Sequence, residues 1–376
     1  MKTILAVETS CDDTSVALVT PDGYVKKVVS AHQNLYHEVF GGIVPEIACR
    51  NHTHALLPLI DECLKQANTK LEDVDAFAVT SQPGLIGSLL VGIVTVKSLS
   101  LSTGKPFIGV NHLEGHLLAP FLKDEGYAPP ENFQYPYVAL AISGGHTSLY
   151  RIEGLGQYEV LGRTLDDAAG EAFDKFGKMA GLGFPGGVRV DRHSKLGRSD
   201  RFQFPRPMLR EDHLNFSFSG MKAAAGRVIE HLDEVDKVEL AADLALALAP
   251  EPEARSGILA DLCASFQEAV VDVLIDRLAR AAKAEGLDRA VLTGGVSANS
   301  RLRERALAWA TREGVQLVVP PIRYCTDNAA MIGFAGAQRL LKGERSDSTL
   351  GPQARAPLGA APVPANLPEW LAKAKS

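Results

Sequence analysis

The same short pattern stands near the start of each half of this 376-residue chain. Residues 4–19 and residues 137–152 each consist of an apolar strand, a turn of small polar residues and a second strand. A repeated unit predicts two lobes of related structure. Elsewhere apolar strands alternate with helical segments, which predicts α/β sheets with parallel strand pairs. The expected strands are 4–7, 15–19, 76–80, 106–110, 137–142, 148–152, 290–293 and 317–319, and the clearest expected helices are 89–101, 258–285 and 328–341.

The composition is that of a globular protein. Hydrophobic residues make up 46% of the chain and charged residues 22%. No apolar run approaches the roughly 18 residues of a membrane-spanning helix, and Glu8 and Asp12 follow the start too soon for a signal peptide. The five cysteines are scattered and form no Cys-x-x-Cys pair, which favours free thiols. We therefore expect a cytoplasmic protein that does not enter a membrane.

The overall charge argues against a chain that holds nucleic acid by itself. The formal net charge is -6, whereas such proteins usually carry a basic excess, and no DNA partner is expected. One segment departs from this average, because lysines and arginines gather between Arg189 and Arg210. This basic stretch fits either a solvated face or a patch that follows a phosphate backbone.

Two histidines lie four residues apart in the segment that begins at Asn111. Residues at i and i+4 share one face of a helix, so His112 and His116 can reach the same metal ion. The segment follows an expected strand, and open α/β sheets bind their ligands at the carboxyl ends of strands. Capping or core histidines give the same pattern. Glu114 is one position away from the glutamate of the protease signature His-Glu-x-x-His.

Three turns of small residues follow apolar strands, at 9–14, 143–147 and 294–299. Backbone N–H groups in such turns can approach a phosphate or a ribose without a side-chain clash. A plain tight turn explains any one of them, but three in a two-lobed chain favour a nucleotide between the lobes. The first turn also carries paired carboxylates, Asp12 and Asp13, which would lie near a metal or a phosphate-bound cation. These two are the candidate catalytic residues.

Further carboxylates have two interpretations each. Asp167, Glu171 and Asp174 stand at helical spacing, which fits a solvated acidic face or a carboxylate that binds ribose hydroxyls. Asp327 opens the last expected helix, where aspartate is a common N-cap. Alternatively, Asp327 adds an oxygen ligand beside the two histidines and leaves positions open for substrate.

Taken in order, these segments resemble the motifs of one family. The chain resembles the ASKHA superfamily, which includes sugar kinases and actin, and within it the bacterial tRNA threonylcarbamoyladenosine synthases of the TsaD family. The match runs from about Thr3 to about Leu341. Two positions depart from the family pattern, because Asp13 stands where a glutamate is expected and Arg189 follows Pro185-Gly186-Gly187-Val188, near which the family commonly has a proline. The resemblance rests on residues 8–14, 41–46, 111–116, 143–147, 166–175, 185–187, 294–299 and 326–330.

The resemblance implies a two-lobed ASKHA fold of the α/β class, with duplicated lobes around a nucleotide cleft. It implies one divalent metal ion, Fe²⁺ in preference to Zn²⁺, bound by His112, His116 and Asp327. It implies an adenylate substrate, threonylcarbamoyl-AMP, in a site that also accepts ATP or ADP. The residues implied to line that site are Ile142, Ser143, Gly144, Gly145, His146, Asp174, Gly187, Asp191 and Asn299.

The implied reaction is transfer of the threonylcarbamoyl group to the N6 amine of the adenosine 3′ to the anticodon, in tRNAs that read codons beginning with A. The implied partners are tRNA, the paralogous ASKHA protein TsaB and the small ATPase TsaE. Two other functions stay open at this point, a metallopeptidase and a non-catalytic ATP-binding scaffold. The first lacks the signature His-Glu-x-x-His, and the second would have little use for a complete metal set.

The expected division of the chain follows from the repeat. Residues 1–130 and 325–342 are assigned to the first lobe, and residues 131–324 to the second. Residues 247–256 are rich in Ala, Pro and Glu and are interpreted as an insertion loop. Residues 343–376 are rich in Pro and Ala, which is typical of a tail that stays disordered unless it docks.

Overall fold

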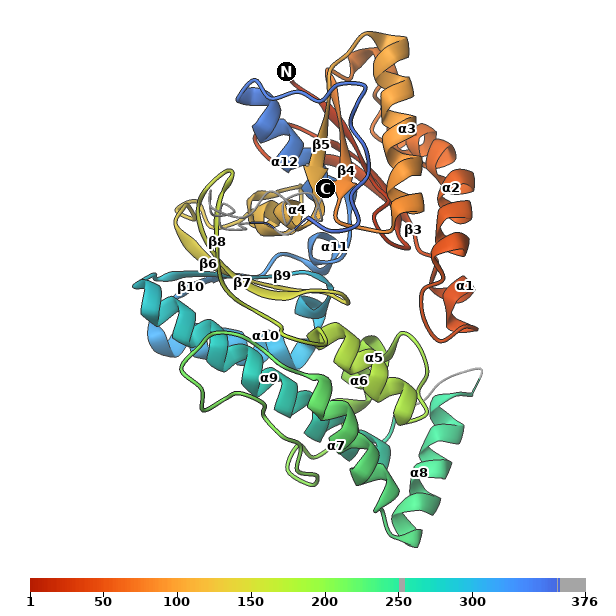
Figure 1. Cartoon of the computed structure of the whole chain (residues 1–376), viewed down its shortest axis with the longest axis vertical. Helices are drawn as coiled ribbons and strands as arrows, with labels where there is room; N and C mark the ends of the chain where they lie inside the picture. Colours follow the sequence, from red (N-terminus) through yellow and green to blue (C-terminus); the bar gives the residue numbers. More distant parts are fainter. Residues whose placement is uncertain (250–253, 357, 359–376) are drawn as a thin grey trace, which may run out of the picture.

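Two five-stranded sheets with the same strand order form the frame of the computed structural model, which describes residues 1–249, 254–356 and 358. The orders are β3-β2-β1-β4-β5 and β8-β7-β6-β9-β10. In the first sheet β1 pairs antiparallel with β2 and parallel with β4, and in the second β6 pairs in the same way with β7 and β9. The two strand–turn–strand units therefore begin two duplicated lobes, which lie one above the other in Figure 1.

Helices cover both faces of the first sheet. Alternate residues of β1 point to opposite faces: Ile4 and Ala6 pack with the helix α12, whereas Leu5 and Val7 pack with α2 and α3. A strand that is covered on both faces reads as a continuous apolar run. The elements are β1 (Ile4–Glu8), β2 (Thr14–Val19), β3 (Val25–Ala31), β4 (Ala76–Gln82), β5 (Phe107–Asn111), α1 (Asn34–Glu38), α2 (Pro45–Gln66), α3 (Ile86–Thr103), α4 (His112–Leu118) and α12 (Ala329–Leu341), with 3₁₀ turns at Leu71–Asp73 and Ala119–Phe121.

The second sheet has a helical layer on one face and α4 on the other. Val138 and Leu140 of β6 pack with α9, and Tyr137 and Ala139 pack with Leu117 of α4. The helix α4 therefore lies between the two sheets (Figure 1). The elements are β6 (Tyr137–Ile142), β7 (Thr147–Gly154), β8 (Gln157–Arg163), β9 (Arg289–Thr293), β10 (Gln316–Val318), α5 (Ala169–Met179), α6 (Gly186–Ser194), α7 (Ser219–Glu230), α8 (Glu234–Ala247), α9 (Ile258–Glu285), α10 (Ser300–Glu313) and α11 (Ile322–Cys325), with a 3₁₀ turn at Gly295–Ala298.

Most expected elements are confirmed. All the expected strands are present to within a few residues, and the long helix has the predicted bounds 258–285. All five cysteines are free thiols. The last helix begins one residue later than predicted, at Ala329. In the stretch 247–256, Ala247 is the last residue of α8, and residues 250–253 lie outside the described part of the chain.

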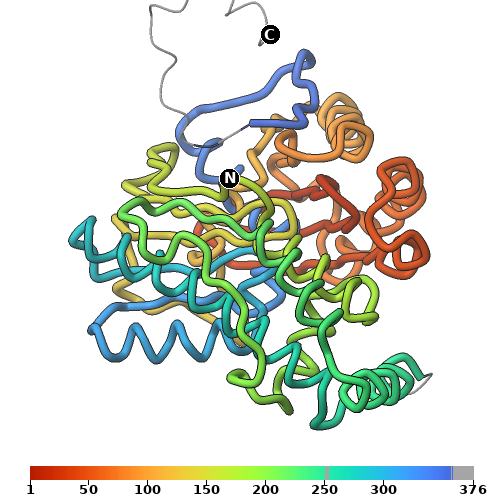
Figure 2. Tube along the Cα trace, turned by 60° about the horizontal axis from the view of Figure 1, so that its bottom comes forward, coloured from red at the N-terminus to blue at the C-terminus, as the bar shows by residue number. Residues whose placement is uncertain are grey.

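The start of the C-terminal segment is docked. The N–H of Ser346 donates to the carbonyl of Phe107 on the edge strand β5, and the N–H of Gln353 donates to the carbonyl of Ser81. The side chain of Leu350 joins the core under α3, and a Cβ on Gly109 would lie 2.9 Å from it. In Figure 2 this blue segment arches beside the orange stretch that contains α3. The rest of the expected tail, 357 and 359–376, lies outside the described residues.

One helix qualifies as a membrane span by length and composition. The helix α3 has 18 residues with a mean hydropathy of 1.5, and 28% of them are buried. The prediction that no apolar run reaches this length was therefore wrong. The small residues Gly, Ser and Thr interrupt the apolar side chains of α3 and hide the run in the sequence. Contacts with β4, β5 and α2 place α3 as a crossover helix on the first sheet.

Candidate functional site

The two histidines lie on α4, which follows β5 directly. Asn111 ends β5 and caps α4, because its side-chain oxygen accepts hydrogen bonds from the N–H groups of Leu113 at 2.9 Å and Glu114 at 3.4 Å. The cap starts the helix at His112. The spacing of four residues then brings the rings of His112 and His116 to a centroid separation of 4.7 Å.

Asp327 joins the two histidines from the distant end of the chain. Its Oδ1 lies 3.1 Å from Nε2 of His116 and 3.4 Å from Nε2 of His112. The capping interpretation of Asp327 is wrong, because Asn328 caps α12 by accepting from the N–H of Met331. The three ligand atoms lie within 4.8 Å of one another. Two imidazole nitrogens and one carboxylate oxygen are donors that suit a divalent ion and leave positions open.

Glu8 orients His112 for this role. The side chain of Glu8 is fully buried, and its Oε2 lies 2.9 Å from Nδ1 of His112. The same oxygen accepts a hydrogen bond from Thr80, and Oε1 accepts from the N–H of Ser10. A carboxylate on Nδ1 keeps the proton there and leaves Nε2 free to bind a metal. The sequence analysis assigned Glu8 no role, since nothing local indicates a contact across 104 positions.

The charges of the centre depend on one another. Burial alone lowers the pKa of His112, but Asp327 and Glu8 outweigh burial and hold that pKa well above its usual value. Burial lowers the pKa of His116 in spite of its hydrogen bond to Asp327. Burial opposes ionisation of Asp327, yet the charge of His112 holds its pKa well below the usual range. Two carboxylates therefore face one imidazolium, and the negative excess favours a cation.

Replacing Glu8 by glutamine is expected to weaken metal binding about 10- to 100-fold. A glutamine side chain has one carbonyl oxygen, so its NH₂ group must face either the N–H of Ser10 or the side shared by Thr80 and His112. Equilibrium dialysis measures the affinity without an activity assay. Glu153→Gln on β7, in an exposed ion pair with Arg151, is the matched control. Equal affinities of the two variants would show that Glu8 does not orient the ligand.

The turn after β6 lies beside the metal residues. The N–H of Ser143 donates to the carbonyl of His146 at 2.7 Å, and the N–H of His146 donates to Oγ of Ser143 at 3.1 Å. Burial, together with the charges of His112 and His116, lowers the pKa of His146 to about 4. Charges act this strongly only at short range. His146 is therefore neutral at pH 7 and adjoins the metal centre.

Two glycines let the neighbouring turns approach this one. A Cβ on Gly170, at the start of α5, would lie 2.6 Å from the carbonyl oxygen of Ser143. A Cβ on Gly294 would lie 2.4 Å from the carbonyl oxygen of Ile142, and Gly294 also has a φ of 86°. A side chain at either position would clash with these carbonyl oxygens, and at Gly294 the positive φ also favours glycine. The predicted turns 143–147 and 294–299 therefore meet at the amino end of α5.

Asp174 holds the start of α6. Its Oδ1 accepts hydrogen bonds from the N–H groups of Gly186 at 2.8 Å and Gly187 at 3.3 Å. Burial raises the pKa of Asp174 against these two hydrogen bonds, and the charge of Asp12 adds to the rise. Asp174 therefore orders the backbone at the start of α6, where Gly187 is one of the residues predicted to bind the adenylate.

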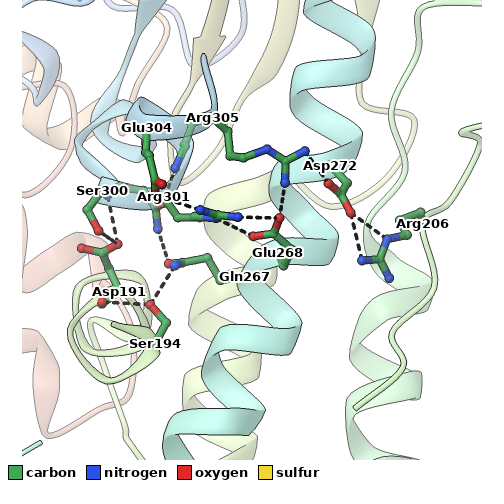
Figure 3. A network of polar contacts seen from close by, with 12 residues as sticks. Asp191, Ser194, Arg206, Gln267, Glu268, Asp272, Ser300, Arg301, Glu304 and Arg305 are labelled. Atoms are coloured by element: carbon green, nitrogen blue, oxygen red, sulfur yellow. Dashed lines mark hydrogen bonds and ion pairs between the residues drawn. The ribbon is translucent and has the colours of Figure 1, made fainter. Parts of the chain in front are cut away.

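Asp191 belongs to a polar network that joins α6, α9 and α10 (Figure 3). Its Oδ1 accepts hydrogen bonds from the N–H of Ser300 at 2.9 Å and from its hydroxyl at 2.8 Å. Gln267 donates to Ser194 on α6 at 2.7 Å and accepts from Nδ2 of Asn299 at 2.6 Å. The network brings the predicted residues Asp191 and Asn299 together at the start of α10.

The two candidate catalytic carboxylates have different surroundings. Oδ1 of Asp13 lies 2.8 Å from Nδ1 of His32, a residue that the sequence analysis did not mention. Burial raises the pKa of Asp13 in spite of this contact. After burial, the negative charge of Asp12 is a further cause of the raised pKa of both Asp13 and Asp174. A catalytic role for Asp12 or Asp13 stays a prediction.

The predicted acidic helix face is wrong. The helix α5 begins at Ala169, so Asp167 precedes it and does not share a face with Glu171 and Asp174. Lys175 instead draws Asp167 and Glu171 together, at 2.6 and 2.9 Å. Neither carboxylate is therefore free to bind ribose hydroxyls.

The basic stretch 189–210 is largely neutralised within the protein. Five of its basic side chains form ion pairs with acidic residues elsewhere in the protein or nearby in the sequence. This favours the interpretation as a solvated face over that of a patch that follows a phosphate backbone. The ion pairs are Arg189–Glu38, Lys195–Asp191, Arg198–Asp200, Arg201–Asp236, Arg201–Asp261 and Arg206–Asp272.

Comparisons with known proteins agree with this site. The family model "TsaD: tRNA N6-adenosine threonylcarbamoyltransferase" matches residues 25–334. A tRNA N6-adenosine threonylcarbamoyltransferase of Bdellovibrio bacteriovorus is 60% identical over 353 residues, which are 94% of this chain and 97% of that protein. The protein of the same description from Thermodesulfovibrio yellowstonii is 46% identical, over 94% of this chain and 99% of that one.

A solved structure extends the agreement to the fold. Full-length HypF, in its phosphate- and nucleotide-bound form, aligns with a TM-score of 0.54 at 12% identity, over 90% of this chain and 46% of that chain. At this identity the likeness concerns the fold alone, and it agrees with the predicted two-lobed α/β fold. The metal ligands, the convergent turns and the matched relatives thus have one explanation: the chain belongs to the TsaD family of tRNA N6-adenosine threonylcarbamoyltransferases.

Proposed function

We propose that this tRNA-modifying transferase moves the threonylcarbamoyl group of threonylcarbamoyl-AMP to N6 of the adenosine 3′ to the anticodon, in tRNAs that read codons beginning with A. One observation carries the proposal. Leu113, which follows His112 on α4, lines the same cavity as Gly145 and His146, which supports placing the metal residues beside the turn that is predicted to bind the adenylate. A donor held by that turn would place its carbonyl group next to the metal ligands.

The reaction needs no covalent enzyme intermediate. The N6 amine attacks the carbamoyl carbon, the bond from that carbon to the phosphate oxygen breaks, and AMP leaves with the electron pair while N6 loses one proton. A bound divalent ion would polarise the carbamoyl oxygen as a Lewis acid. The adenine amine is a poor nucleophile, so holding it against the carbonyl group supplies much of the rate.

The residues of the chain position the donor. A Cβ on Gly144 or Gly145 would meet no atom within 4 Å, so a ligand has room beside these residues, and their backbone N–H groups would suit the α-phosphate. Asp174 orders the loop at Gly187 through its hydrogen bonds. His146, neutral at pH 7, offers a hydrogen bond without adding a second positive charge beside His112. ATP or ADP would use the same contacts.

We infer that the ion is Fe²⁺ in preference to Zn²⁺. The support is the donor set, because two histidines and one carboxylate with open positions are typical of non-haem iron, although zinc accepts the same ligands. Metal analysis of protein purified without oxygen tests the choice. Stoichiometric zinc and no iron would contradict it.

A buried ion pair argues against the metallopeptidase alternative. A peptidase needs a carboxylate that activates water beside the histidines. Glu114, which stands between them in the sequence, is fully buried and paired with Arg339 at 2.6 Å. Its carboxylate is thus unavailable as a base. The intact set His112, His116 and Asp327 likewise disfavours a scaffold without catalysis.

We propose that a paralogous partner of the TsaB type covers an apolar stripe on α3. Ile86, Leu90 and Val94 recur every four residues and are about half exposed. We expect Val94→Glu to abolish co-purification with the TsaB encoded in the same genome and to leave metal affinity unchanged. Leu307→Glu on α10, equally exposed in the other lobe, is the control. Retained co-purification of Val94→Glu would remove the stripe from the interface.

The family also leads us to propose TsaE as an ATPase partner and the cytoplasm as the location. The direct test of function is mass spectrometry of tRNA nucleosides from cells depleted of this chain. Loss of threonylcarbamoyladenosine, restored by the unsubstituted chain, is the expected result. A normal level after depletion would contradict the proposed function.

A further inference from the structure

A cavity lies beside His146, between the turn that follows β6 and the docked C-terminal segment. It has a volume of about 310 Å³, which suits a single small ligand or one nucleobase. Leu113, next to the metal ligand His112, and His146 line it, so the cavity reaches the metal centre. Asp174, Gly187, Asp191 and Asn299 do not line it. The cavity therefore shares Gly145 and His146 with the predicted adenylate site, while the rest of its lining comes from other residues.

Three separate parts of the chain build this cavity. The first lobe supplies Pro83 and Leu113, and the second supplies residues 145–148 with the wall of β7 and β8. The third part is the docked C-terminal segment, whose residues 354–356 and Leu358 close the outer side. Because this wall comes from beyond the last helix, the cavity exists only while the segment is docked.

Hydrogen bonds hold that wall in place. Ser346 and Gln353 anchor the segment on β5 and β4, and Lys97 of α3 donates to the carbonyl of Ser348 at 2.8 Å. Nδ2 of Asn111 donates to the carbonyl of Ala356 at 3.0 Å. Asn111 also caps α4 through its other side-chain atom. The outer wall and the metal-binding helix are thus fixed by one side chain.

The chemistry of the lining is apolar inside and cationic at the rim. The apolar part of the lining includes the buried side chains of Leu113 and Tyr150. The cationic part consists of two exposed residues, Arg163 and Arg355. Among the residues that the structure describes, no carboxylate pairs with Arg163 or Arg355, in contrast to the arginines of the basic stretch. A base between flanking phosphates has the complementary pattern.

We propose that this cavity is the acceptor site, in which the nucleobase of the tRNA adenosine lies against Leu113 and Tyr150 while Arg163 and Arg355 bind the phosphates on either side. The assignment rests on the proposed function and adds the place and the residues that hold the second substrate. Because the cavity shares Gly145 and His146 with the predicted adenylate site, a base held in it would bring its N6 amine next to the donor carbonyl group, as an attack on that carbonyl requires.

Steady-state transfer by the complete modification system tests this assignment, with tRNA and threonylcarbamoyl-AMP varied in turn. We expect Arg163→Ala and Arg355→Ala each to raise the KM for tRNA about 3- to 10-fold and to make it less dependent on salt. The kcat and the KM for the adenylate should change less than about twofold, because neither arginine touches the donor. Arg198→Ala, an exposed arginine paired with Asp200, is the matched control.

Two truncations test the wall itself. A chain that ends after Leu358 keeps all the residues that line the cavity. A chain that ends after Gln353 keeps the hydrogen bonds of Ser346 and Gln353 but loses the cavity wall at 354–356 and Leu358, together with the hydrogen bond from Asn111 to Ala356. We expect only the shorter chain to show the raised KM for tRNA.

The outcomes separate this assignment from the proposed function. An unchanged KM for tRNA in both arginine variants would overturn it while the unsubstituted chain still transfers normally. A raised KM for the adenylate instead would assign the cavity to the donor. No transfer by the unsubstituted chain would overturn the proposed function, and the acceptor assignment with it.

Discussion

Replacing His112 by alanine is expected to remove the bound metal and to lower kcat for transfer by at least about 100-fold. The two remaining ligands, His116 and Asp327, come from one short helix and one loop and cannot hold an ion as tightly as three. The donor carbonyl group then loses the charge that stabilises its oxygen in the transition state. Metal content by mass spectrometry and single-turnover transfer measure the two effects.

The substitution also removes the imidazole that contacts the buried carboxylate of Glu8, so folding of the variant must be checked. Thr80 and the N–H of Ser10 still hydrogen-bond the carboxylate, and we therefore expect a folded protein with a lower melting temperature. His54→Ala, at an exposed position on α2, is the control for loss of an imidazole. Full activity in a metal-free His112→Ala protein would remove the metal from the mechanism.

The strands and turns of the site could be predicted because their signals are local. Residues 4–19 and 137–152 show apolar strands that are interrupted by small polar residues, and both form the predicted hairpins. The helix 258–285 was equally clear, since apolar residues recur along it as far as Gly286, which ends it in the left-handed conformation. The spacing of His112 and His116 was a local signal of the same kind, and the structure brings these two candidate metal ligands together on one helix.

The contacts that support the site could not be predicted, because they join distant parts of the chain. Glu8 meets His112 across 104 positions, and Glu114 meets Arg339 across 225. Asp327 was ambiguous between a cap and a ligand, and only the side chain of Asn328 decides between them. The docking of Leu350 depends on space above Gly109, which composition does not reveal.

Replacing Glu114 by alanine is expected to lower the free energy of unfolding by about 3 kcal/mol. The carboxylate is fully buried and binds Arg339 through two hydrogen bonds, at 2.6 and 2.8 Å. It also accepts a hydrogen bond from Tyr158 of β8 at 2.7 Å. Without Glu114, the guanidinium of Arg339 and the hydroxyl of Tyr158 lose these hydrogen bonds, although Glu344 still pairs with Arg339.

Urea unfolding of the metal-free protein measures this effect. Glu46→Ala removes an exposed ion pair with Arg50 on α2 and should change the same free energy by less than about 0.5 kcal/mol. Tyr158→Phe removes only one hydrogen bond and should cost about 1 kcal/mol. An effect of Glu114→Ala as small as that of Glu46→Ala would mean that water reaches the pair.

The position of the Glu114–Arg339 ion pair also predicts an effect on metal binding, which can be measured separately from stability. Glu114 lies on α4 between the two histidines, and Arg339 lies on α12, the helix that follows Asp327. The pair thus fixes the distance between the helices that present the metal ligands.

A double substitution, Glu114→Met with Arg339→Met, removes both charges and should restore much of the stability, because a buried ion pair and an apolar pair of similar volume are often equally stable. Metal affinity should stay low in this double variant, since two flexible apolar side chains do not set that distance as two hydrogen bonds do. Recovery of both quantities would contradict the positioning role and leave the pair only the task of neutralising buried charge.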